Sequence, residues 1–177
     1  MGEGKSSLLV IDVQLGPLWG TYKKDETFSV IQKMIVKAER ENVPVFYIQF
    51  EGPKGDLLAR GTQFWQFAPG ITPREQDIVI YKRAADSFYQ TELQEELQKR
   101  GVTHLVVVGV RTEFCIDTTC RAALSQGFDV TLVEDGHTTV DGVYTAEQII
   151  NLHNSTLRGV KTPEHQIAIV KADKVIF

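Results

Sequence analysis

Cys115 is the residue whose place in the sequence most clearly suggests chemistry. It follows an apolar run, Leu105 to Val108, and Gly109, which together predict a buried strand that ends in a short turn. A helical pattern then opens around Cys115, so its thiol would face the unpaired N–H groups and the positive dipole end of that helix. Both features favour thiolate over thiol, which would make Cys115 a nucleophile. The alternative is a small, inert core residue.

Two charged residues, Asp12 and Lys82, each close an apolar run that is typical of a buried parallel strand. Asp12 follows Leu8 to Ile11, and Lys82 follows Ile78 to Tyr81. Ligands of open α/β sheets bind outside the carboxyl ends of the strands, so we expect Asp12, Lys82 and Cys115 to converge there. The alternatives are that Asp12 only caps a loop and that Lys82 only extends to solvent.

Strand and helix patterns alternate along the chain, as in a parallel sheet covered by helices on both faces. We therefore predict the α/β class: one domain spanning residues 1–177, a Rossmann-like three-layer sandwich whose mainly parallel, six-stranded sheet has the order 3-2-1-4-5-6. The predicted strands are residues 8–12, 44–50, 78–81, 105–110, 128–133 and 167–170. The predicted helices are residues 26–41, 91–100 and 144–157, together with the helix that opens at Cys115 and ends at Gly127.

The composition excludes several classes of function. The chain has 177 residues, 42% of them hydrophobic and 24% charged, which is ordinary for a globular protein with a sizeable core. A net charge of −4 gives no basic surface for nucleic acid, and no apolar run approaches the roughly 20 residues that span a bilayer. Residues 1–7 lack the apolar stretch of a secretory signal, so we expect a cytoplasmic protein without nucleic-acid or membrane partners.

The two cysteines, Cys115 and Cys120, do not suggest a disulfide or a metal site. Residues five apart on a helix differ in direction by about 140°, so the two thiols would face apart. The pair has no histidine nearby, which is a poor zinc signature. We expect Cys120 to be a core residue and predict neither metal nor cofactor.

The segment of residues 52–72 is rich in glycine and aromatic residues and is predicted to be a long loop. Loops of this length in a compact domain usually have a function. Its aromatic residues either pack on the core or form the wall of a substrate pocket or a subunit interface. They are Phe64, Trp65 and Phe67.

Several motifs together resemble the isochorismatase-like cysteine hydrolase family over nearly the whole chain. The segments that carry the resemblance are Asp12-Val13-Gln14, the loop from Gly61-Thr62 to Pro69-Gly70-Ile71, Lys82 with Asp86-Ser87-Phe88 and Thr91-Glu92-Leu93, Gly109 to Cys115 with Asp117-Thr118-Thr119 and Arg121-Ala122-Ala123, and Glu134 to Thr139. Members of this family include nicotinamidases, carbamoyl amide hydrolases, ureidoacrylate hydrolases, streptothricin hydrolases and isochorismatase. The resemblance also implies a homo-oligomer, a dimer or higher.

The resemblance implies a catalytic triad of Asp12, Lys82 and Cys115. Asp12 would take the thiol proton and later return it to the leaving nitrogen, and Lys82 would supply a cation beside both anions. Cys115 would attack a carbonyl carbon to give a thioester that water hydrolyses. The resemblance further implies that the backbone N–H groups of Arg111 and Cys115 bind the oxyanion, the first turned inward by a cis peptide bond between Val110 and Arg111.

The chain departs from the nicotinamidase-like members, which hold a metal near the second strand through an aspartate and histidines. The corresponding segment, Gln49 to Pro53, has no histidine, and the four histidines of the chain are scattered elsewhere. This departure makes nicotinamide a less favoured substrate. His137, which follows the fifth predicted strand, is either a pocket residue or a hydrogen-bonded structural group.

The favoured function is hydrolysis of a small amide or carbamoyl C–N bond. The alternatives are vinyl-ether hydrolysis of an isochorismate-type acid, with Asp12 as the acid, and a catalytically quiet binding or assembly subunit. The Arg111 side chain either recognises a carboxylate or lies on the surface. We predict a small-molecule pocket formed by Gln14, Leu18, Trp65, Phe88 and Phe114.

Overall fold

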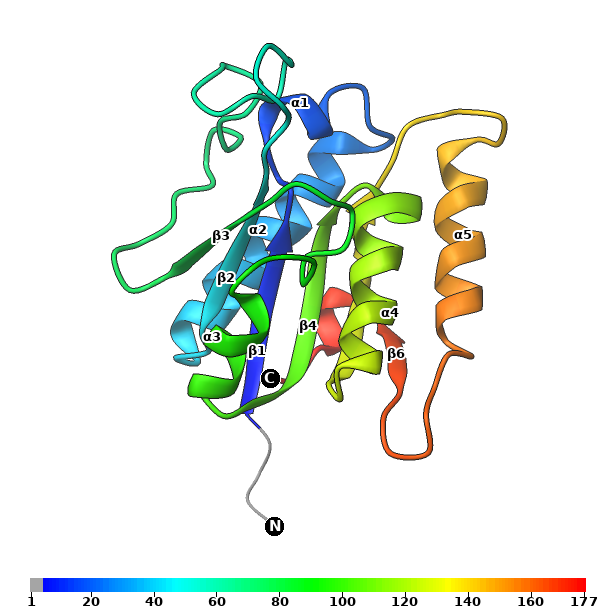
Figure 1. Cartoon of the computed structure of the whole chain (residues 1–177). Coiled ribbons are helices and arrows are strands. Elements are labelled where there is room, and N and C mark those ends of the chain that lie inside the picture. Colours follow the sequence, from blue (N-terminus) through cyan, green and yellow to red (C-terminus); the bar gives the residue numbers. More distant parts are fainter. Residues whose placement is uncertain (1–4) are drawn as a thin grey trace.

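The computed structural model describes residues 5–177; residues 1–4, which belong to the predicted domain and to the segment searched for a signal, lie outside it. All six strands are parallel and lie in the order β3-β2-β1-β4-β5-β6, which confirms the predicted topology (Figure 1). Their bounds are β1 Lys5–Ile11, β2 Val45–Phe50, β3 Ile78–Lys82, β4 Val102–Val110, β5 Asp129–Thr138 and β6 Ile167–Val170.

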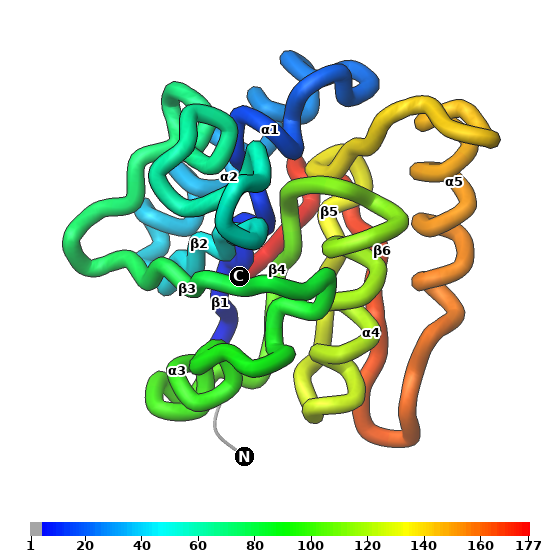
Figure 2. Tube along the Cα trace, turned by 45° about the horizontal axis from the view of Figure 1, so that its top comes forward, coloured from blue at the N-terminus to red at the C-terminus, as the bar shows by residue number. Residues whose placement is uncertain are grey.

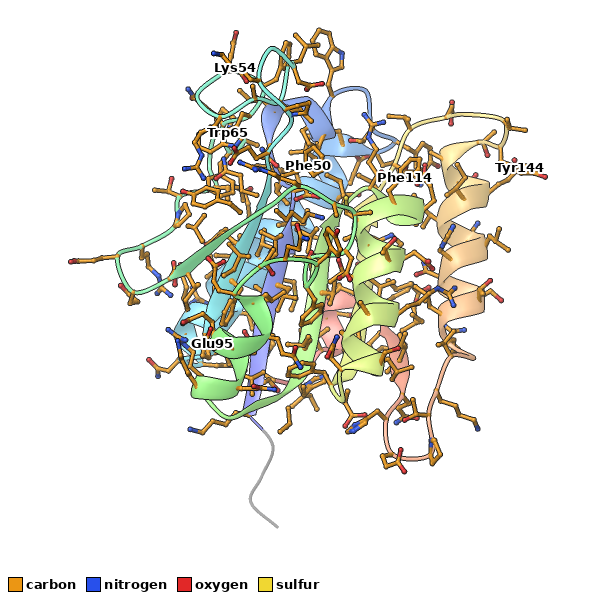
Figure 3. All side chains as sticks on the ribbon, in the orientation of Figure 1. Phe50, Lys54, Trp65, Glu95, Phe114 and Tyr144 are labelled. Atoms are coloured by element: carbon orange, nitrogen blue, oxygen red, sulfur yellow. The ribbon has the colours of Figure 1, made fainter. Side chains whose placement is uncertain are left out.

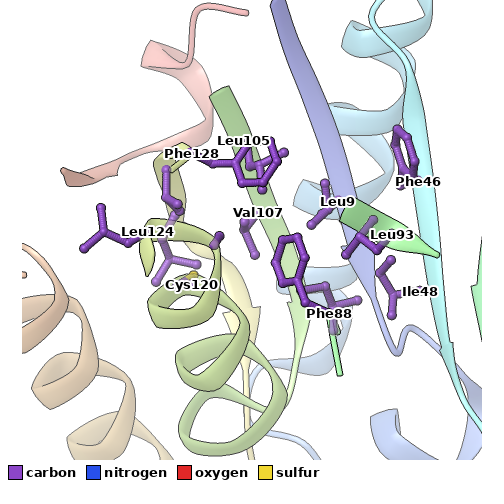
Figure 4. Close-up of a cluster of buried hydrophobic side chains, with 14 of the residues drawn as sticks. Leu9, Phe46, Ile48, Phe88, Leu93, Leu105, Val107, Cys120, Leu124 and Phe128 are labelled. Atoms are coloured by element: carbon purple, nitrogen blue, oxygen red, sulfur yellow. The ribbon is translucent and has the colours of Figure 1, made fainter. Parts of the chain in front are cut away.

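Helices cover both faces of this sheet because successive strand residues point to opposite sides. Leu8 and Val10 pack on one face with α1 and α2, whereas Leu9 and Ile11 pack on the other with α3, α4 and α5 (Figure 1). Figure 4 shows Cys120 of α4 among the buried apolar residues of this second face. The helices are α1 Leu15–Leu18, α2 Lys24–Arg40, α3 Leu93–Lys99, the π-helical turn η1 Thr112–Ile116, α4 Asp117–Ser125, α5 Ala146–Leu157 and the 3-10 turn η2 Ala172–Lys174.

Gly109 allows β1 and β4 to approach closely where both strands end. It pairs with Ile11, and a Cβ atom at Gly109 would lie 2.1 Å from the Ile11 carbonyl oxygen. Its φ of +133° also lies in a region that side chains rarely adopt. The register of β4 with β5 shifts between Val107 and Gly109. The glycine therefore brings the segments after β1 and β4 together at the carboxyl edge of the sheet.

The segment between β2 and β3 lies over this same carboxyl edge, next to α1 (Figures 1 and 2). It contains no helix or strand, but isolated bridges join Gln14 to Phe67 and Gly52 to Ala59. The predicted loop is therefore present and is fastened to the end of β1. Among residues 5–177, no helix has both the length and the apolar composition needed to cross a bilayer.

Candidate active site

The structure brings Asp12, Lys82 and Cys115 together at the carboxyl edge. Asp12 follows β1, Lys82 ends β3 and Cys115 lies in η1, directly after β4. The Lys82 Nζ atom is 2.9 Å from Asp12 Oδ2, and both side chains are almost fully buried. Lys82 Nζ also donates a hydrogen bond to the Ala85 carbonyl oxygen at 3.0 Å. The Cys115 thiol lies near enough to both the carboxylate and the ammonium for each of them to shift its pKa.

The backbone holds Asp12 in an uncommon conformation. Its φ is +53°, in the left-handed region, which costs a residue other than glycine on the order of 1–3 kcal/mol. The Asp12 N–H donates to the Ile48 carbonyl at 2.9 Å, and the Asp12 carbonyl accepts from the Gln14 N–H at 2.8 Å. Within residues 5–177, no donor makes a hydrogen bond of regular geometry with either carboxylate oxygen beside the ion pair with Lys82. The carboxylate can therefore take up a proton without breaking such a bond.

Burial and the neighbouring charges shift the pKa values of all three groups. Burial, reinforced by the Asp12 carboxylate, raises the pKa of the Cys115 thiol to about 12, and Lys82 only partly opposes this. Burial also raises the pKa of Asp12, against the attraction of Lys82. For Lys82, burial acts to lower the pKa, but Asp12 and Cys115 outweigh it and raise the pKa. The shift of the Cys115 pKa runs against the predicted thiolate: burial favours the thiol form, beside a carboxylate whose raised pKa makes it a stronger base than usual.

A cavity of about 690 Å³ opens over Asp12 and Cys115. This volume lies within the range of small-molecule sites. Figure 3 places Phe50 and Phe114, two of its lining residues, at the carboxyl edge of the sheet. The other lining residues come from α1 and the residues beside it, from the 52–72 loop and from the turn after β4. They are Gly16, Pro17, Trp19, Asp56, Leu57, Leu58, Phe64, Val110 and Arg111.

Of the five predicted pocket residues, only Phe114 lines this cavity; Gln14, Leu18, Trp65 and Phe88 do not. The Gln14 side chain is buried and holds two loops together, with its Nε2 donating to the carbonyls of Phe50 and Trp65. The Trp65 ring stacks on Tyr81 at a centroid distance of 6.2 Å. Leu18 and Phe88 are buried in the two apolar cores, on opposite faces of the sheet.

Phe64 lines the cavity, which is one of the two roles considered for the aromatic residues of the long loop, whereas three further wall residues were not predicted: Trp19, Leu57 and Leu58. Trp19 and Phe64 contact each other at a ring-centroid distance of 5.4 Å, so α1 and the long loop together form one side of the cavity. The available signal was the apolar Pro17-Leu18-Trp19 segment directly after the Asp12 motif. Which of its side chains faces the site depends on the direction of α1, and no periodicity is visible in so short a helix.

Arg111 connects β4 to η1. The peptide bond between Val110 and Arg111 is cis, and Cys115 lies in the first turn of η1. The Arg111 side chain is partly buried, and its Nε donates to the Pro17 carbonyl oxygen at 3.3 Å. Arg111 thus links the segment before the nucleophile to Pro17, on another wall of the cavity.

His137 belongs to a buried chain of hydrogen bonds behind the site and does not line the cavity. The Asn154 side chain donates to the Glu134 carbonyl at 3.3 Å, which directs its Oδ1 toward His137 Nε2 at 2.9 Å. Because Oδ1 can only accept, Nε2 carries the proton, and Nδ1 accepts from the Thr112 hydroxyl at 2.9 Å. Of the two roles considered for His137, the structure shows the structural one.

We expect His137 to make stability strongly dependent on pH. Burial lowers its pKa from 6.5 to about 4, so between these values the unfolded chain binds a proton that the folded chain does not. Stability should therefore fall by about 3 kcal/mol as the pH is lowered from 6.5 to 4. Urea unfolding of wild type and His137→Gln across this range measures the effect, because other titrating groups cancel in the difference. Equal pH slopes for the two proteins would contradict it.

The segment after β2 forms ion pairs. Glu51 accepts from Arg60 at 3.0 Å and from Arg83 at 3.1 Å. In the described part of the chain, no group of three or more histidine, cysteine, aspartate or glutamate side chains is arranged to hold a metal ion.

Known proteins are similar to this chain in sequence and in fold. The family model "Isochorismatase domain" matches residues 6–162. The isochorismatase family protein YddQ of Bacillus subtilis is 30% identical over 88% of this chain and 92% of its own length. A streptothricin hydrolase of Streptomyces noursei is 33% identical over 76% of this chain. A secreted isochorismatase effector of Verticillium dahliae is 33% identical over 67% of this chain. The matches span only 50% of the streptothricin hydrolase and 64% of the effector.

Solved structures of isochorismatase family proteins have the same fold as this chain. The crystal structure of an isochorismatase from Pseudomonas putida has a TM-score of 0.88 and 28% identity, and the alignment covers 99% of this chain and 94% of that one. A crystal structure of an isochorismatase family protein has a TM-score of 0.81 and 30% identity, with 92% and 96% of the two chains covered. The chain belongs to the isochorismatase family, whose members are hydrolases and include amidohydrolases.

Proposed function

We propose that this protein hydrolyses a C–N bond of a small amide or carbamoyl compound through a covalent thioester on Cys115. The observation that carries the proposal is a thiol beside a buried carboxylate–ammonium pair, with the thiol and the carboxylate both lining an open, mostly apolar cavity. Two relatives with this type of activity support it: the streptothricin hydrolase, and a ureidoacrylate amidohydrolase of Caulobacter vibrioides that is 33% identical over 46% of this chain.

The first half of the proposed reaction forms the thioester. Asp12 accepts the proton of the Cys115 thiol as the sulfur attacks the carbonyl carbon, so the thiolate never has to accumulate. The N–H groups of Arg111 and Cys115 would bind the oxyanion of the tetrahedral intermediate. Asp12 then passes its proton to the leaving nitrogen, and the C–N bond breaks to release the amine or ammonia.

The second half returns the enzyme to its starting state. Asp12 accepts a proton from a water molecule that attacks the thioester carbon, and the C–S bond breaks as the acid product leaves. The proton returns to the sulfur. Lys82 remains charged throughout, because the Asp12 carboxylate and the Cys115 sulfur both favour its protonated form.

A labelling experiment tests the covalent step. The intact protein is treated with an activated small amide or ester, and the site of the adduct is mapped by mass spectrometry. We expect acylation of Cys115, whose thiol is partly exposed in the cavity, and none of Cys120, which is fully buried. Acylation of Cys120 alone, or amide turnover without any thioester on Cys115, would reject the mechanism.

A further inference from the structure

The cavity contains one cation that lacks an ionic partner. Its charged lining residues are Asp12, which pairs with Lys82, Asp56, whose Oδ1 accepts from the Leu58 N–H at 2.7 Å, and Arg111. Within residues 5–177, Arg111 forms no ion pair, and its single hydrogen bond runs from Nε to the Pro17 carbonyl. Other arginines of the described chain do pair with carboxylates: Arg60, Arg74, Arg83, Arg100 and Arg121.

The anchoring of Nε leaves both terminal nitrogens of the guanidinium without a protein partner in the described structure. These nitrogens are the donors that bind a carboxylate in the bidentate geometry. Most of the surrounding wall is apolar, including Trp19, Phe64 and Phe114. A partly buried cation in apolar surroundings is costly unless an anion joins it. The arrangement therefore favours a ligand that brings its own negative charge.

We propose that the substrate is an amide with an aromatic or similarly flat apolar body and one carboxylate, which Arg111 binds while the amide carbonyl lies at Cys115. This inference rests on the proposed hydrolysis and specifies its substrate class. The apolar body would lie against Trp19, Phe64 and Phe114, and the volume of about 690 Å³ accommodates a substituted ring.

Matched substrates isolate the role of the carboxylate. The half-amides of the three benzenedicarboxylic acids are compared with the corresponding acetylbenzamides, in which a neutral methyl ketone replaces the carboxylate. Ammonia release gives kcat and KM for each compound. We expect the wild type to prefer the best acid over its neutral isostere by 10- to 100-fold in kcat/KM, about 1.4–2.7 kcal/mol.

Variants of Arg111 then test whether this side chain causes the preference for the acid. Arg111→Gln should remove at least 10-fold of the preference, mainly by raising KM for the acid, and Arg111→Lys should restore part of it. Arg158→Gln removes a charge from an exposed position at the end of α5 and should leave the preference unchanged. A wild-type enzyme with no preference for the acid, or an Arg111→Gln enzyme that retains it, would overturn the proposal.

A binding measurement separates this proposal from the proposed hydrolysis. The benzenedicarboxylates are titrated calorimetrically into the Cys115→Ser protein, with and without Arg111→Gln. Binding that weakens at least 10-fold without Arg111 supports the carboxylate site, even if no amide is hydrolysed. Absent binding, or binding indifferent to Arg111, overturns the carboxylate site, even if neutral amides are turned over.

Discussion

Replacing Cys115 by alanine is expected to lower kcat for amide hydrolysis on the order of 10⁴-fold or more, because no other described thiol contacts the Asp12–Lys82 pair. Removing the sulfur abolishes the thioester route, and residual turnover would come only from binding and oxyanion stabilisation. Stability should change little, because Cys115 is partly exposed beside an open cavity. Steady-state kinetics together with urea unfolding of wild type and Cys115→Ala measure both quantities.

Cys120→Ala is the matched control. Cys120 is five residues further along the same helical segment and is fully buried among apolar residues (Figure 4). Its replacement should reduce stability through lost packing and leave kcat within a few-fold of wild type. An active Cys115→Ala enzyme would refute covalent catalysis. If that variant cleaved vinyl ethers and this activity needed Asp12, the isochorismatase-type alternative would replace the proposal.

The convergence of the three candidate residues could be predicted because it depends on topology. The carboxyl ends of parallel strands share one edge, so a carboxylate after β1, an ammonium at the end of β3 and a thiol after β4 are expected on the same edge of the sheet. The periodicity of the sequence is sufficient to predict which residues lie at the strand ends. This prediction does not require the direction in which any side chain points.

The pocket walls could not be predicted, because they depend on side-chain direction in short or irregular segments. Gln14 has a polar side chain near the site, but its amide nitrogen donates hydrogen bonds to the carbonyls of Phe50 and Trp65 and does not face the cavity. Leu18 ends α1 and Trp19 follows it directly, but Leu18 is buried and Trp19 lines the cavity. The direction of the Cys115 pKa shift was missed for a related reason: a helix terminus lowers a thiol pKa, but burial, visible only in the folded structure, raises it.

Removing the ammonium from the Asp12–Lys82 pair should destabilise the protein severely. In Lys82→Met, a buried carboxylate loses its counter-ion while the new side chain keeps a similar length. Breaking one partner of a buried pair costs on the order of 3–5 kcal/mol. The double variant Asp12→Asn with Lys82→Met no longer buries a charge there and should recover part of this loss. Urea unfolding of the two single variants and the double variant gives the coupling free energy.

The pH dependence of Lys82→Met distinguishes a lost ion pair from simple loss of packing. Burial already raises the pKa of Asp12, and the loss of Lys82 removes the main effect that opposes it. The folded variant then binds a proton at pH values where the unfolded chain does not, so its stability falls as the pH rises. Relative to wild type, Lys82→Met should therefore regain stability as the pH is lowered from 8 toward 5 (roughly the range over which a buried carboxyl titrates). A deficit that stays constant across this range would mean that Lys82 stabilises the fold by packing, and the electrostatic role assigned to it in catalysis would lose its basis.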